Sequence, residues 1–276
     1  MTIPYAEVIG DPIAHSKSPV IHKFWLERLS LEADYRACLV RPAELGSYFE
    51  ARARDENWLG CSITMPHKIE ALRYAPKHRD PSFPIEPINA AVRRENGKLE
   101  GLNTDFNGLF EPLHRLHGFR AGEQRGPAIV VGAGGVLYPV MMALATFGYG
   151  PIWIAMRDPA RMAQVADDYE GVQGIPIALS DPLPPARLLI NASPLGMSGF
   201  PPFPLSLESI EEGGIVFDLV YSPVETQLLR EAGARNLRTI DGLTMLIGQA
   251  AVAFQIFFGK APPREYDDEL RGRLIE

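Results

Sequence analysis

The chain has 276 residues, 46% of them hydrophobic, and a formal net charge of -7. This length suits one large domain or two modest ones, and the composition excludes a disordered chain because it can bury a core. An acidic balance without a basic run argues against nucleic acid as an obligatory partner. The two cysteines, Cys38 and Cys61, have no Cys/His cluster at ligand spacing, so neither a zinc site nor a disulfide framework is indicated.

The sequence also bears on location and partners. Its first residues lack a basic segment followed by an apolar core, so we expect no signal peptide. No stretch reaches the roughly 18 apolar residues that a membrane span needs. We therefore expect a cytoplasmic protein, monomeric or homodimeric, with a small-molecule substrate and with neither a membrane nor a nucleic acid as partner.

The first hundred residues alternate strand and helix patterns. Strands are expected at 5–9, 35–40 and 59–63, and helices after Pro19, from Pro42 and from near Pro66. The dipeptide Asn96-Gly97 lies between extended runs at 91–94 and 98–102, which is a strong hairpin signal. Alternating strands and helices predict a mostly parallel sheet.

From residue 104 a second α/β pattern begins. A helix is expected at 104–116, and a buried strand at 128–131 leads through a glycine turn into another helix. Further strands at 152–155, 188–190 and 215–217 have the spacing of a doubly wound sheet. Residues 193–204, with four prolines and two glycines, predict a surface loop near a cleft, and 243–258 predict a buried helix.

The predicted fold class is therefore α/β with two domains. An N-terminal, mostly parallel α/β substrate domain is expected over 1–104, completed by C-terminal helices at 241–276. A Rossmann-type doubly wound dinucleotide-binding domain is expected over 105–240. Substrate handling thus precedes cofactor binding along the chain.

The glycine turn consists of Gly132, Ala133, Gly134 and Gly135. Its glycines can let the backbone approach a pyrophosphate, which the following helix N-terminus favours electrostatically. The dinucleotide fingerprint wants a small residue where Leu137 stands. A strand-to-helix turn without any ligand is the alternative at this point.

A second signal for the cofactor follows the strand at 152–155. Arg157 and Arg161 can hold the 2′-phosphate of NADP, whereas Asp158 would repel it or accept hydrogen bonds from the ribose of NAD. Alternatively, Asp158 only caps the next helix, with Pro159 at its first position. Two guanidinium groups against one carboxylate favour NADP, with NAD possible.

Polar motifs in the first half contain the candidate chemistry. Ser16 and Ser18 stand near a helix start, where both hydroxyls can donate to a small hydroxylated anion or simply cap the helix. Lys68 is either a solvated charge or, beside Asp105, a proton donor and acceptor. Asp105 can also cap the helix at 104–116, and both roles can hold at once. His15, His22 and His67 have no metal-like spacing, so we expect structural hydrogen-bonding roles.

Together and in this order, these motifs resemble the shikimate/quinate dehydrogenase family over nearly the whole chain. The motifs are Gly10-Asp11-Pro12-Ile13-Ala14-His15-Ser16-Lys17-Ser18-Pro19, Ile63-Thr64-Met65-Pro66-His67-Lys68, Asn103-Thr104-Asp105, Gly132-Ala133-Gly134-Gly135, Asn191-Ala192-Ser193-Pro194-Leu195-Gly196-Met197, Asp218-Leu219-Val220-Tyr221-Ser222-Pro223 and Gly242-Leu243-Thr244-Met245-Leu246-Ile247-Gly248-Gln249-Ala250. The resemblance implies hydride transfer between a nicotinamide cofactor and a ring carbonyl, as in 3-dehydroshikimate, within a pathway that leads to chorismate and the aromatic amino acids.

The resemblance also implies roles for individual residues. Lys68 would be the catalytic acid/base and Asp105 its partner. The substrate would contact Ser16, Ser18, Thr64, Asn89, Tyr221 and Gln249. The cofactor would contact the glycine turn, Arg157, Asp158, Arg161, Asn191, Ser193, Met197, Gly242 and Met245.

Several positions depart from the family pattern. They are Ser62, Ala90, Phe106, Leu137 and Met156. We therefore keep open a branch that acts on quinate, an aminated analogue or a related hydroxy acid, or one that uses NAD. A weakly active dinucleotide-binding regulator of the same fold is a second class of function. A folate-linked methylene dehydrogenase is less favoured because it leaves Ser16 and Ser18 unexplained.

Overall fold

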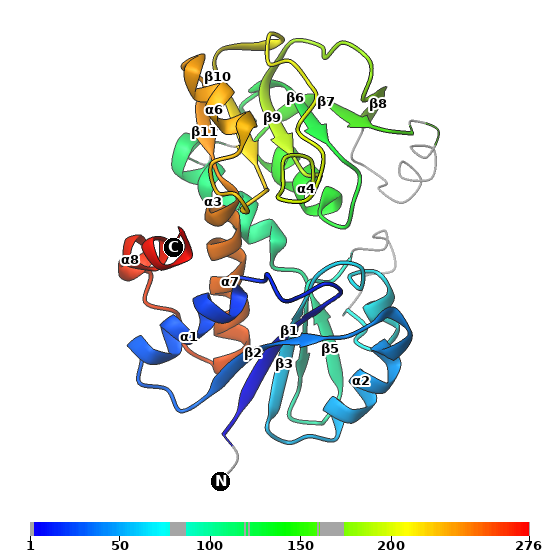
Figure 1. The fold of residues 1–276 in the computed structure, drawn as a ribbon, viewed down its shortest axis with the longest axis vertical. Coiled ribbons are helices and arrows are strands. Elements are labelled where there is room, and N and C mark those ends of the chain that lie inside the picture. The colour runs from blue at the N-terminus through cyan, green and yellow to red at the C-terminus, as the bar shows by residue number, and fades with distance from the viewer. Residues whose placement is uncertain are drawn as a thin grey trace. The chain divides into compact units, whose positions relative to one another are not determined.

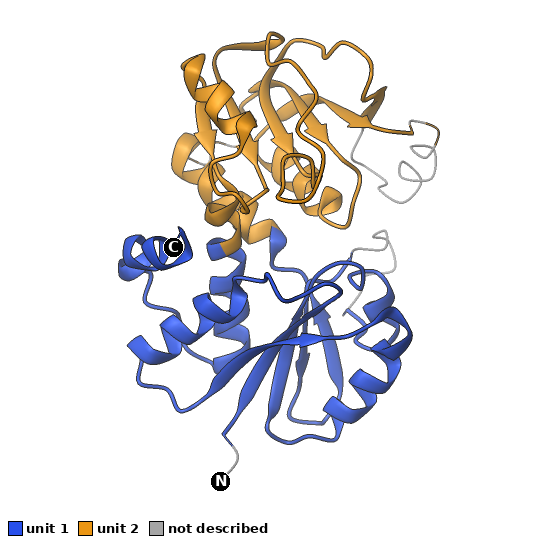
Figure 2. Cartoon of the chain, in the orientation of Figure 1, with its two compact units in different colours: residues 1–105, 247–276 blue, residues 106–246 orange. Residues whose placement is uncertain are grey.

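The computed structural model describes residues 3–77, 87–118, 120, 122–158, 160 and 174–275. The chain divides into two compact units, coloured separately in Figure 2. The first unit contains residues 1–105 and 247–276, and the second contains residues 106–246. The division expected from the sequence placed the boundaries after residues 104 and 240, and its assignment of substrate and cofactor to the two parts stays a proposal.

The first unit contains a five-stranded sheet in the order β2-β1-β3-β4-β5. Its strands are β1 (Tyr5–Gly10), β2 (Asp34–Leu39), β3 (Trp58–Ile63), β4 (Ala90–Arg93) and β5 (Leu99–Leu102). Only β4 runs against the others, so the sheet is mostly parallel as expected. The predicted hairpin joins β4 to β5, and Gly97 has the positive φ of 75° that the turn requires.

Helices cover both faces of this sheet (Figure 1). They are α1 (Ser18–Arg28), α2 (Leu45–Ala53) and α7 (Gly242–Phe258), and α8 (Asp267–Ile275) packs on α1. The short 3-10 helices of this unit are η1 (Pro42–Glu44), η2 (Glu70–Arg73) and η4 (Arg264–Tyr266). Ile9, Cys61 and Ile63 pack with α2 in one hydrophobic cluster. On the other face the chain needs a glycine at position 60, because a Cβ there would lie 2.8 Å from the Phe257 ring of α7.

The expectation of a helix that begins near Pro66 is wrong. Residues 64–69 form turns, and only the 3-10 helix η2 follows. The Lys68 carbonyl, which a helix would pair with a downstream amide, accepts a hydrogen bond from Ile88 N at 3.0 Å. A contact with a distant segment therefore replaces the local helical hydrogen bond, and Lys68 lies on a turn.

The second unit contains a six-stranded parallel sheet in the order β11-β10-β9-β6-β7-β8. Its strands are β6 (Gly126–Val131), β7 (Tyr149–Met156), β8 (Gly174–Ala178), β9 (Ala186–Asn191), β10 (Ile210–Asp218) and β11 (Arg238–Ile240). Read from β8, this is the strand order of the doubly wound dinucleotide-binding fold. The expected fold class is therefore confirmed.

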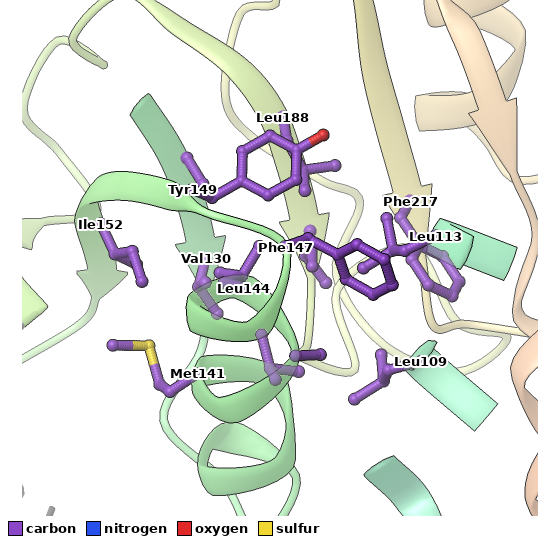
Figure 3. Packing of buried hydrophobic residues seen from close by; sticks show 14 of the residues in the cluster. Leu109, Leu113, Val130, Met141, Leu144, Phe147, Tyr149, Ile152, Leu188 and Phe217 are labelled. Atoms are coloured by element: carbon purple, nitrogen blue, oxygen red, sulfur yellow. The ribbon is translucent and has the colours of Figure 1, made fainter. Parts of the chain in front are cut away.

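The helices of the second unit are α3 (Asp105–His117), α4 (Leu137–Thr146) and α6 (Gln227–Ala234). Figure 3 shows the core between two of them and the sheet, where Leu109 and Leu113 of α3 approach Leu144 of α4 and Phe217 of β10. The sequence did not lead us to expect β8, β11 or α6, whereas α7 and α8 lie in the range where C-terminal helices were expected. No helix within the described ranges has the length and apolarity to cross a membrane.

Candidate active site

The polar motifs of the first unit meet at one edge of its sheet. Parallel strands β1, β3 and β5 end at this edge and the antiparallel β4 begins there. Thr64 follows β3, Asn89 precedes β4, and Asp105 comes shortly after β5. Backbone hydrogen bonds join these ends, with Thr64 N donating to Ile9 O at 3.0 Å and Asn89 N donating to Leu102 O at 3.0 Å. The topology therefore brings together motifs that are far apart in sequence.

Lys68 and Asp105 form a direct ion pair at this edge. Lys68 Nζ lies 2.5 Å from Asp105 Oδ2. The side chains are 18% and 6% exposed, so both are largely shielded while the ammonium keeps some access. The carboxylate thus holds the ammonium in one place at the surface of the unit, and that geometry suits proton transfer to a ligand oxygen.

Asn89 links the pair to further buried groups. Its Nδ2 donates to Asp105 Oδ1 at 2.8 Å and to Thr104 Oγ1 at 2.9 Å, and its Oδ1 accepts from Thr104 N at 2.7 Å. Gln249 Oε1 lies 3.3 Å from Thr104 Oγ1 and 3.4 Å from Asn89 Nδ2. Both oxygens of Asp105 are therefore engaged, one by Lys68 and the other by Asn89.

Two features of this network were not expected. Thr104 is 1% exposed and bridges Asn89 and Gln249, although we had given it no role. Asp105 does not act as a helix cap in this arrangement, because α3 begins at Asp105 itself and the side-chain Oδ1 of Asn103 accepts from Asp105 N at 2.9 Å. The only sequence signal for Thr104 was its place inside the motif.

The remaining residues predicted for the substrate lie in two places. Thr64 approaches β1 so closely that a Cβ at Gly10 would lie 2.5 Å from its Cγ2. Ser16 Oγ accepts from Ser18 N at 3.3 Å in a local turn, whereas the N-cap residue of α1 is Lys17 and makes no side-chain capping bond. Tyr221 belongs to the second unit, where burial raises the pKa of its hydroxyl.

The histidines differ in their environments. His67 Nε2 lies 2.7 Å from the Val40 carbonyl, a structural hydrogen bond of the expected kind. His22 is different, because neither ring nitrogen has a hydrogen-bond partner among the described residues. Its ring stacks on Tyr35 with 3.9 Å between centroids, and burial lowers its pKa to about 3. The expectation of a hydrogen-bonding role for His22 is therefore wrong.

In the second unit the glycine turn lies beside the loop that follows β9. Gly132 has a φ of 104°, and a Cβ there would lie 3.0 Å from both Ala192 O and Ser193 Cβ. Strands β6 and β9 are neighbours at the point where the strand order reverses, which is where open α/β sheets bind their ligands. Gly132 therefore allows two chain segments to approach each other at the expected dinucleotide site.

The turn before α4 has room for a ligand. The first amide of the helix, Leu137 N, donates to Gly134 O at 2.9 Å, and Pro139 has no amide hydrogen to offer. No described atom lies within 4 Å of a Cβ built on Gly134, which leaves open space above the turn. Leu137 is fully buried in the core cluster, so the large residue in place of the small one faces away from this space.

Residues after β7 bear on the choice of cofactor. Asp158 Oδ1 accepts from Ala160 N at 3.1 Å, which is the local role that we had kept as its alternative. Arg157 is exposed at the end of the strand next to the glycine turn. Arg161 lies outside the described residues. Arg157 is thus an exposed cation directly after β7.

Asn191 organises the loop that faces the glycine turn. It is fully buried, and its Nδ2 donates to Leu195 O and to Asp218 Oδ1, both at 2.9 Å. Its Oδ1 accepts from Ser193 Oγ at 2.7 Å. Asp218 also accepts from Thr226 Oγ1 at 2.6 Å, and burial raises its pKa. Asn191 therefore shapes the loop rather than presenting its own amide to a cofactor, and Asp218, which we had not singled out for this role, supports it.

The last predicted cofactor residues differ in exposure. Met197 is partly exposed in the loop after β9, whereas Met245 is 9% exposed and belongs to the core cluster. A Cβ at Gly242 would lie 2.5 Å from both Leu219 O and Val220 O, so α7 begins in close contact with the segment that follows β10. Gly242 therefore has a packing role, whether or not a cofactor touches it.

The strand order and the glycine turn at its switch point define a dinucleotide-binding unit, joined in one chain to a unit that carries a lysine–carboxylate pair. Residues 8–90 match the shikimate dehydrogenase substrate binding domain, and residues 242–268 match the shikimate 5'-dehydrogenase C-terminal domain. The shikimate dehydrogenase (NADP(+)) of Sphingopyxis alaskensis is 47% identical over 99% of this chain and 97% of that protein. The chain belongs to the shikimate dehydrogenase family.

Solved structures agree with this assignment. The shikimate 5-dehydrogenase of Thermus thermophilus, in complex with NADP(H) and shikimate, has 33% identity and a TM-score of 0.81 and covers 99% of this chain and 100% of its own. The quinate dehydrogenase of Corynebacterium glutamicum in complex with NAD has 25% identity and a TM-score of 0.83, covering 98% and 99%. The family resemblance expected from the motifs is confirmed.

Most departures from the family pattern are explained by packing. Phe106, Leu137 and Met156 contribute to the core of the second unit. Ala90 is fully buried in β4. Ser62 Oγ accepts from the Tyr35 hydroxyl at 2.8 Å, so the Ser62 hydroxyl is already engaged in an internal hydrogen bond.

Proposed function

We propose that the protein is an NADP-dependent oxidoreductase that interconverts 3-dehydroshikimate and shikimate. The observation that carries this proposal is the Lys68–Asp105 pair, in a chain 47% identical to a shikimate dehydrogenase (NADP(+)). A hydrogen bond from Asn89 holds the carboxylate of this pair. Ser16, Ser18, Thr64 and Gln249 of the first unit would bind the carboxylate and ring hydroxyls, as would Tyr221 of the second unit. A cytoplasmic location and a monomeric or dimeric state stay predictions.

Lys68 has the central chemical role. In the direction of reduction its ammonium donates a proton from Nζ to the oxygen of the carbonyl as that oxygen gains charge. In the reverse direction the neutral amine accepts the hydroxyl proton. Asp105 Oδ2 keeps Nζ in position in both directions, and Asn89 prevents the carboxylate from rotating by holding Oδ1. The nicotinamide, when bound, supplies or accepts the hydride.

The second unit would hold the cofactor through groups that fit its phosphates. The pyrophosphate would lie at the N-terminus of α4, where the helix dipole favours an anion, over the open space at Gly134. Arg157 would pair with the 2′-phosphate, since Asp158 is engaged by Ala160 N. This arrangement explains a preference for NADP over NAD.

The test is an absorbance assay of reduced cofactor with the purified full chain. Shikimate and quinate are each oxidised with NADP⁺ and with NAD⁺, and we expect the highest kcat/KM for shikimate with NADP⁺. Higher kcat/KM for quinate with NAD⁺ would place the protein in the other branch. Absence of turnover with all four combinations, while NADP⁺ still binds in a calorimetric titration, would instead support a dinucleotide-binding regulator.

A further inference from the structure

The second unit contains a cavity at the amino ends of its strands. Tyr149 begins β7, Gly126 begins β6 and Arg238 begins β11, and all three line this cavity. The glycine turn follows the carboxyl end of β6, so it lies at the opposite edge of the same sheet. The cavity volume is about 590 Å³, and small-molecule sites typically have about 300–1,000 Å³. The cavity is therefore large enough for a metabolite and separate from the expected dinucleotide site.

Three arginines converge on this cavity from different elements. Arg125 precedes β6, Arg187 lies in β9 and Arg238 in β11. The Arg187 side chain passes over Gly126, where a Cβ would lie 3.2 Å from its Cγ. Tyr149 adds a hydroxyl, which lies 2.8 Å from His117 Nε2. The wall thus combines planar guanidinium donors with a phenol and an imidazole.

The carboxylates of the lining do not neutralise all of this charge. Glu123 pairs with Arg125 at 2.6 Å, and Glu211 pairs with Arg187 at 2.6 Å. Within the described ranges the side chain of Arg238 makes neither an ion pair nor a hydrogen bond. Arg125 is 13% exposed, and its Nε is buried without a hydrogen-bond partner among the described residues. One cation and one buried donor are therefore left for a ligand.

The pKa of His117 is affected by the positive charge of the cavity. Burial lowers its pKa, and the neighbouring Arg125 and Arg238 charges lower it further, against an opposing effect of Glu123. An anion bound between these groups would reduce the repulsion that the imidazolium experiences. A change in the properties of this ring would therefore indicate an anion bound in the cavity.

We propose that this cavity binds a small phosphate monoester. Guanidinium groups bind phosphate through paired hydrogen bonds, and donors from several sides match a tetrahedral group with several oxygens. The cavity exceeds what a bare phosphate ion would fill, which leaves room for the organic substituent of an ester. This ligand would be neither the proposed substrate nor the proposed cofactor, so the cavity would be a second binding site of the protein.

The experiment is a calorimetric titration of the full chain with inorganic phosphate and with glycerol 1-phosphate. Each titration is run without NADP⁺ and again at saturating NADP⁺. We expect saturable binding of both probes under both conditions, with glycerol 1-phosphate about tenfold tighter, equivalent to about 1.4 kcal/mol. Loss of binding at saturating NADP⁺ would assign the phosphate to the cofactor site and overturn the proposal. Equal or weaker binding of the ester would reject the monoester.

Variants locate the site. Arg238→Gln should weaken glycerol 1-phosphate binding at least tenfold, whereas Arg235→Gln, an exposed arginine outside the cavity lining, should leave it unchanged. The His117 ring signal in the NMR spectrum, assigned with His117→Gln, should shift on titration. Unchanged affinity in Arg238→Gln, or a static His117 signal, would contradict the proposal. No saturable binding at millimolar concentrations would mean that the arginines serve only as internal counter-charges for Glu123 and Glu211.

Discussion

The polar edge of the first unit and the glycine turn of the second unit are built in different ways. At the first edge the site is formed by side chains, because Lys68, Asp105 and Asn89 hold one another through hydrogen bonds. At the second edge the site is formed by the backbone, because Gly132 lets two chain segments approach each other and Gly134 leaves open space before α4. Substitutions at the first edge should therefore lower kcat, whereas those at the second should raise the KM for the cofactor.

Lys68→Ala should have the largest effect. Removing a general acid/base typically costs about a hundredfold to ten-thousandfold, so we expect kcat to fall about a thousandfold. Shikimate binding, measured by calorimetry, should persist. Lys23→Ala is the matched control, because Lys23 is an exposed lysine of the same unit that pairs with Asp34. Activity of Lys68→Ala within twofold of the parent would remove Lys68 from the mechanism.

Gly132→Ala tests the backbone side of the comparison. A residue with a Cβ is disfavoured at a φ of 104°, and this Cβ would lie 3.0 Å from Ala192 O. A strained backbone position costs about 1–3 kcal/mol, so we expect the KM for NADP⁺ to rise about thirtyfold while kcat stays within twofold. Gly233→Ala is the control, because its Cβ would meet no described atom within 4 Å. A fall in kcat at unchanged KM would erase the distinction between the two edges.

The strand pattern of both sheets could be predicted because apolar runs and turn residues are local signals. The hairpin at Asn96-Gly97 and the parallel order around the glycine turn depend on such signals, and both are confirmed. β8 and β11 were missed because β11 has three residues and the burial of both strands is incomplete. The prediction of a helix near Pro66 was wrong because Lys68 O accepts a hydrogen bond from Ile88 N instead of from a helical amide, and Ile88 belongs to a distant segment.

The candidate site could be predicted only where residues carried their own chemistry. Lys68 and Asp105 were chosen as an ammonium and a carboxylate, and the structure brings them together, although their roles are still to be tested. Thr104 and Asp218 act by hydrogen-bonding to Asn89 and Asn191, and nothing in their local sequence indicates those partners. His22 resembled a hydrogen-bonding residue, and only the fold shows it stacked among aromatic rings.

Arg157→Gln separates charge from backbone at the cofactor edge. The exposed guanidinium would meet only the 2′-phosphate, so we expect kcat/KM to fall about tenfold with NADP⁺ and to stay unchanged with NAD⁺, in line with about 1.4 kcal/mol for an exposed charged contact. Arg230→Gln, an exposed arginine in α6, should change neither value. An equal loss with both cofactors would mean that Arg157 supports the fold rather than the 2′-phosphate.

Thr104→Val should have the smallest effect and shows how far the side-chain network extends. Valine keeps the shape of threonine but removes the hydroxyl that lies 2.9 Å from Asn89 Nδ2 and 3.3 Å from Gln249 Oε1. The loss of one neutral hydrogen bond, about 1 kcal/mol, should lower kcat about fivefold because Asn89 then holds Asp105 less firmly. Thr104→Ser should restore kcat, and Thr239→Val, at an exposed position of β11, should leave it unchanged. If serine fails to restore kcat while thermal stability is normal, the hydroxyl does not position the pair, and the side-chain network ends at Asn89.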